Sequence, residues 1–176
     1  MIQYPIYLDN CATTPMDERV LNSMLPFFTK YFGNAASHSH AYGWQAEEAV
    51  KQAREQVAEL IGATENEIVF TSGATESDNL ALKGSFESHK TKGNHIITVK
   101  TEHKAVLDSC LHLEKNGAEV TYLPVNRNGL INPDELENSI RSKAILIAVK
   151  YANNETGVIR PGKGMCKIAH TNRILI

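Results

Sequence analysis

The sequence predicts an α/β fold in which a mostly parallel sheet is flanked by helices. Between residues 67 and 149, short runs of apolar and β-branched residues alternate with segments of helical periodicity. Such alternation implies right-handed crossovers between parallel strands. The run 144–149 is apolar at every position, as expected for a strand whose sheet has helices on both faces.

The first part of the chain is expected to form an extended arm followed by helices. Residues 1–16 are expected to form an extended arm, because a short apolar run is followed by a turn-rich segment. A helix is expected after Asp17, a good N-cap, with a kink or an early stop at Pro26. Apolar residues at steps of three and four predict a second helix that ends at Gly62. We therefore assign residues 17–66 to N-terminal helices.

The rest of the chain, residues 67–176, predicts four strands and three intervening helices. The strands are expected at 67–71, 95–99, 119–123 and 144–149, and the helices at about 75–91, from the 101–103 cap to 115, and at 133–140. Pro133 suits the first position of the last helix. The strand 144–149 is expected to leave an exposed parallel edge, which is a risk for aggregation.

Composition excludes several classes of function. The net charge of −2 over 176 residues gives no electrostatic case for nucleic acid or for an anionic membrane surface. No apolar run approaches the ~20 residues of a spanning helix, and the N-terminus lacks the features of a signal peptide, so a cytoplasmic location is expected. The three cysteines are widely spaced and the Ser-His-Ser-His stretch at 37–40 lacks further ligands, so no metal site is expected.

Polar segments directly follow three of the predicted strands, at 71–79, 100–104 and 151–157. Ligands of parallel sheets bind beyond the carboxyl ends of the strands. The first segment combines a Gly turn with hydroxyls at a helix start, which suits a phosphate or another anion. An ordinary N-cap would use the same residues.

The other two segments supply an imidazole and side-chain amides. The imidazole of His103 can lie flat over an aromatic ring, and the side-chain amide of Asn153 or Asn154 can donate to a phenolate. A phosphate, a ring and a phenolate oxygen together describe pyridoxal phosphate. A helix cap at His103 and a simple turn at Asn153 and Asn154 remain open as alternatives.

At these residues the chain resembles the cysteine desulfurases of the class V aminotransferase family, the group that serves iron–sulfur cluster assembly and nitrogen fixation. The stretches that carry the resemblance, in order along the chain, are 7–15, 32–34, 43–46, 70–79, 101–107 and 153–157.

The resemblance implies a fold-type I enzyme that uses pyridoxal 5′-phosphate to remove sulfur from L-cysteine, giving L-alanine and an enzyme-bound persulfide. Residues 67–176 would be part of its cofactor-binding large domain. Ala74 and Thr75 would bind the phosphate, His103 would stack on the pyridine ring and act as an acid or base, and Asn154 would donate to the phenolic oxygen. The resemblance also implies a homodimer and sulfur-acceptor or iron–sulfur scaffold proteins as partners.

The chain departs from the family beyond Pro161. Family members run to roughly twice this length, and four of their features have no counterpart here: the Asp that pairs with the pyridine nitrogen, the Ser-x-His-Lys segment whose Lys carries the cofactor, the Arg that binds the substrate carboxylate, and the Cys that receives sulfur. We therefore expect a truncated fold and a chain that is inactive by itself.

Three alternatives remain open. Another class V enzyme, such as a selenocysteine lyase or a small-molecule aminotransferase, would share these motifs. A non-catalytic remnant would only dimerise or bind the proteins of cluster assembly. A split enzyme would have its second half encoded downstream, where a Ser-x-His-Lys segment would reveal it.

Overall fold

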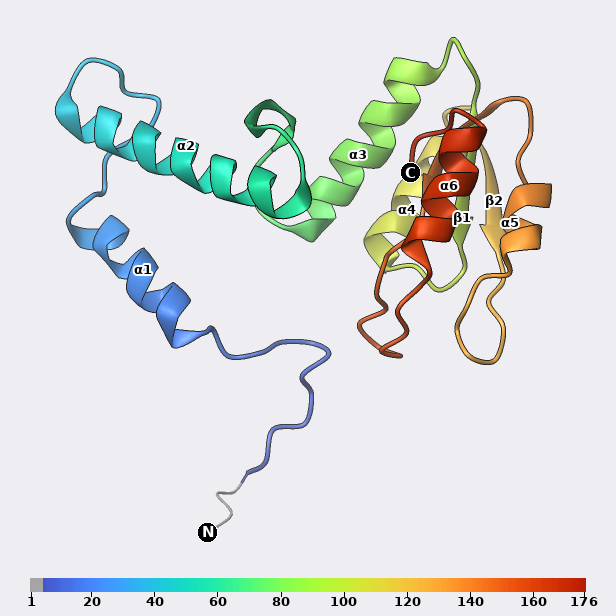
Figure 1. Ribbon diagram of the computed structural model, residues 1–176, viewed down its shortest axis with the longest axis horizontal. Coiled ribbons are helices and arrows are strands. Elements are labelled where there is room, and N and C mark those ends of the chain that lie inside the picture. Colours follow the sequence, from blue (N-terminus) through green and yellow to red (C-terminus); the bar gives the residue numbers. More distant parts are fainter. Residues whose placement is uncertain (1–4) are drawn as a thin grey trace. The chain divides into compact units, whose positions relative to one another are not determined.

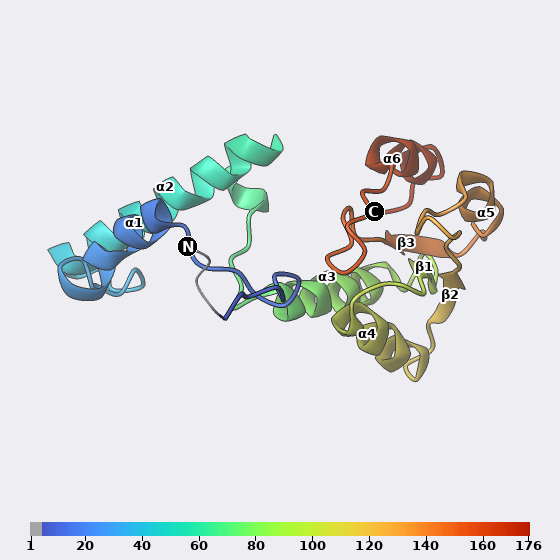
Figure 2. The same cartoon turned by 90° about the horizontal axis from the view of Figure 1, so that it is seen from below.

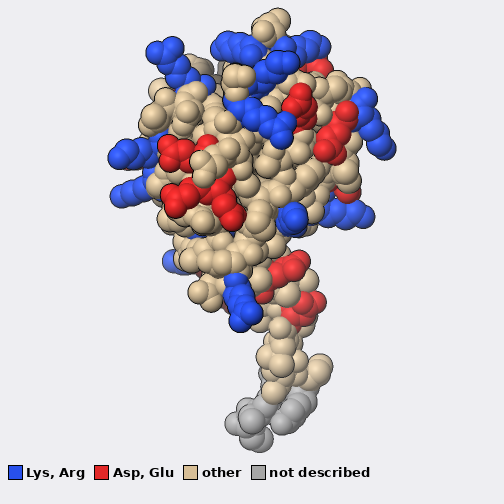
Figure 3. Space-filling view, turned by 90° about the vertical axis from the view of Figure 1, so that its right-hand side faces the viewer, with Lys and Arg blue, Asp and Glu red and all other residues tan. Residues whose placement is uncertain are grey.

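The computed structural model describes residues 5–176 and divides the chain into two compact units, one ending at Phe70 and one running Thr71–Ile176. Figure 1 shows the elements in chain order. Within the described residues, no helix is both long enough and apolar enough to cross a membrane. Basic and acidic side chains are interspersed over the face shown in Figure 3.

The first unit contains α1 (Glu18–Thr29), α2 (Ala41–Ile61) and the short 3₁₀ helix η1 (Glu65–Glu67). Asp17 caps α1 as predicted, its carboxylate accepting the Arg19 N–H at 2.8 Å. Pro26 lies inside α1, and the helix continues past it to its end at Thr29. Gly62 ends α2 with a φ of +70°, a left-handed conformation that glycine adopts without strain.

The helix α1 buries none of its residues. Its apolar side chains are exposed, namely Val20, Leu21, Met24, Leu25, Phe27 and Phe28. The apolar periodicity that predicted this helix therefore marks a face that is uncovered within the described residues.

The strand predicted at 67–71 is wrong. Residues up to Glu67 belong to η1, and the residues that follow take part in none of the strand pairings of the described chain. Ile68 donates its N–H to the Glu65 carbonyl at 3.3 Å, and its own carbonyl accepts from the Arg54 guanidinium. A strand persists only where a neighbouring strand pairs with its backbone. Of the apolar run Ile68-Val69-Phe70, only Ile68 is buried, and Val69 and Phe70 are exposed.

The second unit contains a three-stranded parallel sheet, rather than the four strands predicted, with helices before, between and after the strands. Its elements are α3 (Ala74–His89), β1 (His95–Val99), α4 (Lys104–Glu114), β2 (Glu119–Leu123), α5 (Pro133–Asn138), β3 (Ala144–Ala148) and α6 (Gly162–Thr171). The strand order is β2-β1-β3, and both pairings are parallel. The helix α6 was not predicted from the sequence.

Helices cover both faces of this sheet, as the uniformly apolar β3 predicted. On one face, Ile96 packs with Leu82 and Phe86 of α3 and with Val106 of α4. On the other face, Ile97, Ile147 and Leu123 pack with side chains of α5 and α6, which are Leu136, Met165 and Ala169. Figure 2 shows α4 and α6 on opposite sides of the sheet.

The outer edge of β3 is partly covered by the last residues of the chain. The Ile147 N–H donates to the Leu175 carbonyl at 2.8 Å, and the Leu175 N–H donates to the Ile145 carbonyl at 3.2 Å. The expectation of a fully exposed edge is therefore corrected at these positions, because Leu175 pairs there as a fourth strand would.

Candidate functional site

The turn before α3 is organised by its own hydroxyls. The Thr71 Oγ1 lies 2.6 Å from the Ser77 Oγ and 3.1 Å from the Gly73 carbonyl oxygen. The first intrahelical bond runs from the Ser77 N–H to the Gly73 carbonyl at 3.1 Å. The amides of Ala74 and Thr75 come before that bond, so they are helix-start donors of the kind that bind anions. A Cβ placed on Gly73 would meet no atom within 4 Å, so there is open space in front of the turn.

Glu76 holds this turn from the helix side. Its carboxylate accepts from the Ser72 hydroxyl at 2.5 Å and from the Ser72 N–H at 2.7 Å. These two hydrogen bonds hold the pKa of Glu76 below its usual value. The carboxylate is directed to Ser72, and the Thr75 hydroxyl lies exposed beside the helix start.

His103 is both a helix cap and an accessible imidazole. Its Nδ1 accepts the Ala105 N–H at 3.1 Å, which caps α4. The neutral ring therefore carries its proton on Nε2. The ring is exposed and lines a cavity at the carboxyl end of the sheet. The cap alternative and the ligand alternative are compatible, because the cap uses only Nδ1.

The two neighbouring asparagines have different positions. Asn153 is buried, its Oδ1 accepts the N–H groups of Glu155 and Thr156, each at 2.9 Å, and its Nδ2 donates to the Thr101 carbonyl at 3.3 Å. Asn154 is exposed, and its Oδ1 lies 3.5 Å from the Lys150 Nζ. Asn153 therefore shapes the loop, and Asn154 presents its side-chain amide outward.

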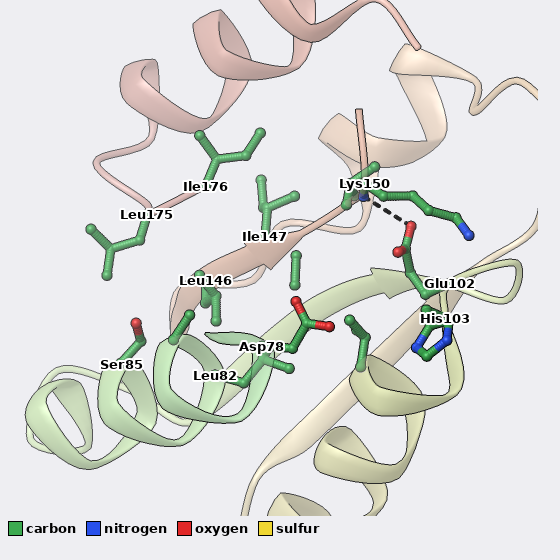
Figure 4. Close-up of a pocket in the computed structure, with 14 residues that line it drawn as sticks. Asp78, Leu82, Ser85, Glu102, His103, Leu146, Ile147, Lys150, Leu175 and Ile176 are labelled. Carbon is green, nitrogen blue, oxygen red and sulfur yellow. Dashed lines mark hydrogen bonds between the residues drawn. The ribbon is translucent and has the colours of Figure 1, made fainter. Parts of the chain in front are cut away.

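A cavity of about 450 Å³ lies between α3, the start of α4 and β3 (Figure 4). Of the four predicted site residues, only His103 lines it. Ala74, Thr75 and Asn154 do not, although Thr75 precedes the lining residue Asp78 by three positions on α3 and Asn154 contacts the lining residue Lys150.

A buried ion pair behind this cavity was not predicted from the sequence. The Arg160 Nη1 lies 2.6 Å from the Glu102 Oε1, and the two side chains are 1% and 2% exposed. Glu102 lines the cavity and also accepts the Lys150 N–H at 3.0 Å, drawn as a dashed line in Figure 4. Residue type does not predict a buried arginine, and its neighbours in the chain, Ile159 and Pro161, are themselves exposed.

The fold is that of an α/β protein with candidate ligand-binding groups at the carboxyl end of a parallel sheet. Residues 6–176 match the family model of class V aminotransferases. The chain belongs to the aminotransferase class V family.

Two relatives of similar sequence carry the same name. The chain is 56% identical over 174 residues to "Cysteine desulfurase IscS" of Neisseria meningitidis serogroup C / serotype 2a, with 99% of this chain and 43% of the relative covered. It is 57% identical over 176 residues to the protein of that name from Glaesserella parasuis serovar 5, with 99% and 43% covered. The chain therefore spans less than half the length of these relatives.

Solved structures of similar fold agree with these relatives. A "NifS-like protein" superposes with a TM-score of 0.87 at 39% identity, covering 93% of this chain and 44% of that structure. "SspA in complex with cysteine" gives a TM-score of 0.87 at 40% identity, covering 93% and 47%. The apo structure of a cysteine desulfurase from Thermococcus onnurineus NA1 gives 0.86 at 30% identity, covering 96% and 42%. These matches confirm the predicted fold class and the resemblance to cysteine desulfurases.

Proposed function

We propose that this chain forms part of a cysteine desulfurase that uses pyridoxal phosphate to convert L-cysteine into L-alanine and transferable sulfur. The observation that carries the proposal is the identity of 54–57% to proteins named cysteine desulfurase IscS, over 99% of this chain. A similar structure described as a complex with cysteine supports the choice of substrate. A homodimer and sulfur-accepting scaffold proteins are part of the same proposal.

The residues present fit the proposed cofactor. The amides of Ala74 and Thr75 and the Thr75 hydroxyl would bind its phosphate at the start of α3, where the open space before Gly73 gives access. The exposed His103 ring would lie on its pyridine ring, and the Asn154 side-chain amide would donate to its phenolic oxygen. When bound, pyridoxal phosphate supplies the electron sink for the chemistry at the substrate carbon.

The protein residues would fix the geometry and handle protons. The cap bond from Ala105 to Nδ1 holds the His103 ring in one orientation, so that its Nε2 can release or take up a proton at the bound substrate. Asn153 accepts the N–H groups of Glu155 and Thr156, which follow Asn154, and donates to the Thr101 carbonyl. These three hydrogen bonds keep the backbone at Asn154 in a defined position. Such preorganisation reduces the ordering cost of binding.

A titration of the chain with pyridoxal phosphate tests this proposal, with calorimetry as the readout. Thr75→Val and Asn154→Leu are each expected to weaken binding by about tenfold or more, since a hydrogen bond to a charged group contributes about 1.5–3 kcal/mol. His103→Ala removes the stacked ring and is expected to weaken binding by up to about tenfold, since a stacked pair of rings contributes about 0.5–1.5 kcal/mol. Thr75→Val is expected also to weaken the binding of inorganic phosphate, whereas His103→Ala is not.

Matched controls lie away from the site. His112→Ala changes an exposed histidine in the last turn of the same helix, α4, and Thr91→Val removes an exposed hydroxyl after α3. Neither control is expected to change the affinity. Equal losses in the controls and in the site variants would contradict the assignment.

A further inference from the structure

The loop that carries Asn154 is fastened to the turn that carries His103 by a buried network of hydrogen bonds. Arg160 is at its centre, and its guanidinium donates to the Glu102 carboxylate at 2.6 Å, to the Thr101 hydroxyl at 2.8 Å and to the Lys150 carbonyl at 3.2 Å. Thr101 and Glu102 directly precede His103 in the chain. Lys150 and Arg160 lie at the two ends of the loop that contains Asn154.

Two of the three residues that accept from Arg160, Glu102 and Thr101, make further hydrogen bonds between the same two segments. The Glu102 Oε1 also accepts the Lys150 N–H at 3.0 Å, and the Thr101 carbonyl accepts from the Asn153 side chain at 3.3 Å. The loop itself is closed by an antiparallel bridge between Ala152 and Ile159. The residues bonded across the network therefore adjoin both proposed cofactor contacts.

Because this network is buried, the loss of one of its charged side chains is expected to have a large effect. Removing one partner of a buried ion pair leaves a charge without compensation, whereas an exposed pair contributes little. The second unit offers a direct comparison, because Arg141 and Glu119 form a pair of the same length, 2.6 Å, with side chains 57% and 49% exposed. It joins β2 to the segment before β3, outside the His103 and Asn154 segments.

We propose that Glu102 and Arg160 form a positioning pair that fixes the Asn154 loop relative to His103, so that both can contact one bound cofactor. The identity of the bound cofactor rests on the proposed function. The fixing of the Asn154 loop relative to His103 does not depend on it. The two side chains are 1% and 2% exposed, and their charged groups are bonded to each other and to the Lys150 backbone, so the effect of the pair passes through the two loops.

Amide hydrogen exchange in the chain provides a test that needs no cofactor. In Arg160→Met, the loop amides of Asn153, Glu155, Thr156 and Gly157 are expected to exchange about tenfold faster or more, because local opening of the loop becomes easier. The amides of β1 and β2 are expected to keep their rates. Arg141→Met is the matched control and is expected to leave the loop amides unchanged.

Cofactor binding supplies the second readout. Arg160→Met is expected to weaken pyridoxal phosphate binding by about tenfold, because two contacts are no longer preorganised, and to leave the binding of inorganic phosphate at the α3 turn unchanged. If the unaltered chain binds no pyridoxal phosphate but the loop exchange responds as expected, the positioning pair stands and the proposed function fails.

The conservative variant Arg160→Lys covers the case in which Arg160→Met does not fold. Lysine retains a positive charge beside Glu102 but lacks the branched guanidinium that reaches the Thr101 hydroxyl. The exchange rates of the loop amides are therefore expected to lie between the wild-type rates and rates about ten times faster. The proposal is overturned if either folded variant protects the loop as well as the wild type does. It is also overturned if exchange accelerates equally in β1 and β2, since the pair would then only stabilise the core.

Discussion

His95 is a titratable side chain whose burial links the stability of the second unit to pH. It is 0% exposed, its Nε2 lies 2.8 Å from the Thr121 Oγ1, and its Nδ1 has no partner among residues 5–176. Burial lowers the pKa of His95, the charge of Arg141 lowers it further, and Glu119 partly opposes both effects. The folded state therefore favours the neutral ring.

The lowered pKa predicts a loss of stability in acid. As the pH falls below about 6.5, the unfolded chain takes up a proton that the folded chain rejects, so the free energy of unfolding decreases until the pH passes the folded-state pKa. Urea unfolding at pH 7.5 and 5.5 measures this loss. His95→Gln is expected to show a smaller loss than the wild type, and His112→Gln is expected to match the wild type. An equal loss in wild type and His95→Gln would refute the account of His95.

The cysteines are expected to differ in reactivity because they differ in burial. Cys110 is 0% exposed, and burial, followed by the charges of Glu114 and Glu102, raises its pKa to about 11. Cys11 is exposed. Since the thiolate is the reactive form, iodoacetamide at pH 7.5 is expected to modify Cys11 in the folded chain and Cys110 only after unfolding. Mass spectrometry of the labelled peptides measures both, and comparable labelling of the two residues would contradict this expectation.

Replacement of two glycines of the second unit by alanine is expected to change the free energy of unfolding in opposite directions. A Cβ on Gly93 would lie 2.2 Å from the Lys143 carbonyl oxygen, beside the point where the His95 N–H bonds that same carbonyl at 2.9 Å. Gly93→Ala must therefore push the starts of β1 and β3 apart, and we expect it to lower the free energy of unfolding by about 1–3 kcal/mol.

Gly84 is the matched case, because a Cβ there meets no atom within 4 Å in the middle of α3. Gly84→Ala is expected to stabilise the chain by about 0.5–1 kcal/mol, since alanine loses less conformational freedom in a helix. Thermal unfolding of both variants measures the difference. A destabilising Gly84→Ala together with a neutral Gly93→Ala would show that the packing at these positions is not as described.

The ends of helices could be predicted from the sequence where a single residue determines them. Asp17, Gly62 and Asn132 mark helix ends through hydrogen bonds or backbone angles that belong to those residues themselves. The strand at 67–71 failed because pairing is a property of two segments, and an apolar run does not reveal its partner. The helix α6 was missed because its Gly-Lys-Gly start gives little helical propensity, and its stability comes from packing Met165 and Ala169 on the sheet.

The candidate site was predictable only in part for the same reason. His103 and Asn154 follow strands, so the edge rule for parallel sheets located them. Asn153 and Asn154 are the same residue type, and only their burial separates a structural side chain from an accessible one. The partnership of Glu102 with Arg160 spans 58 positions and has no local signal.

At the scale of the whole molecule, the two units differ in how much they bury. The strand β1 is buried at every position, whereas α1 buries none of its 12 residues. A helix of that length is marginal without packing. In a solution of this 176-residue chain, the amides of α1 are therefore expected to exchange with solvent orders of magnitude faster than those of β1. Residue-resolved exchange measures this, and equal protection of α1 and β1 would show that α1 is covered in solution.

The central claim is that the carboxyl end of this parallel sheet binds pyridoxal phosphate through Thr75, His103 and Asn154. Amide chemical shifts of the isotope-labelled chain, recorded during a titration with pyridoxal phosphate, test it most directly. The account predicts that the largest changes occur at the Ala74 and Thr75 amides, around His103 and at the Asn154 side-chain amide. Saturating changes confined to other residues, or none at these three positions, would contradict it.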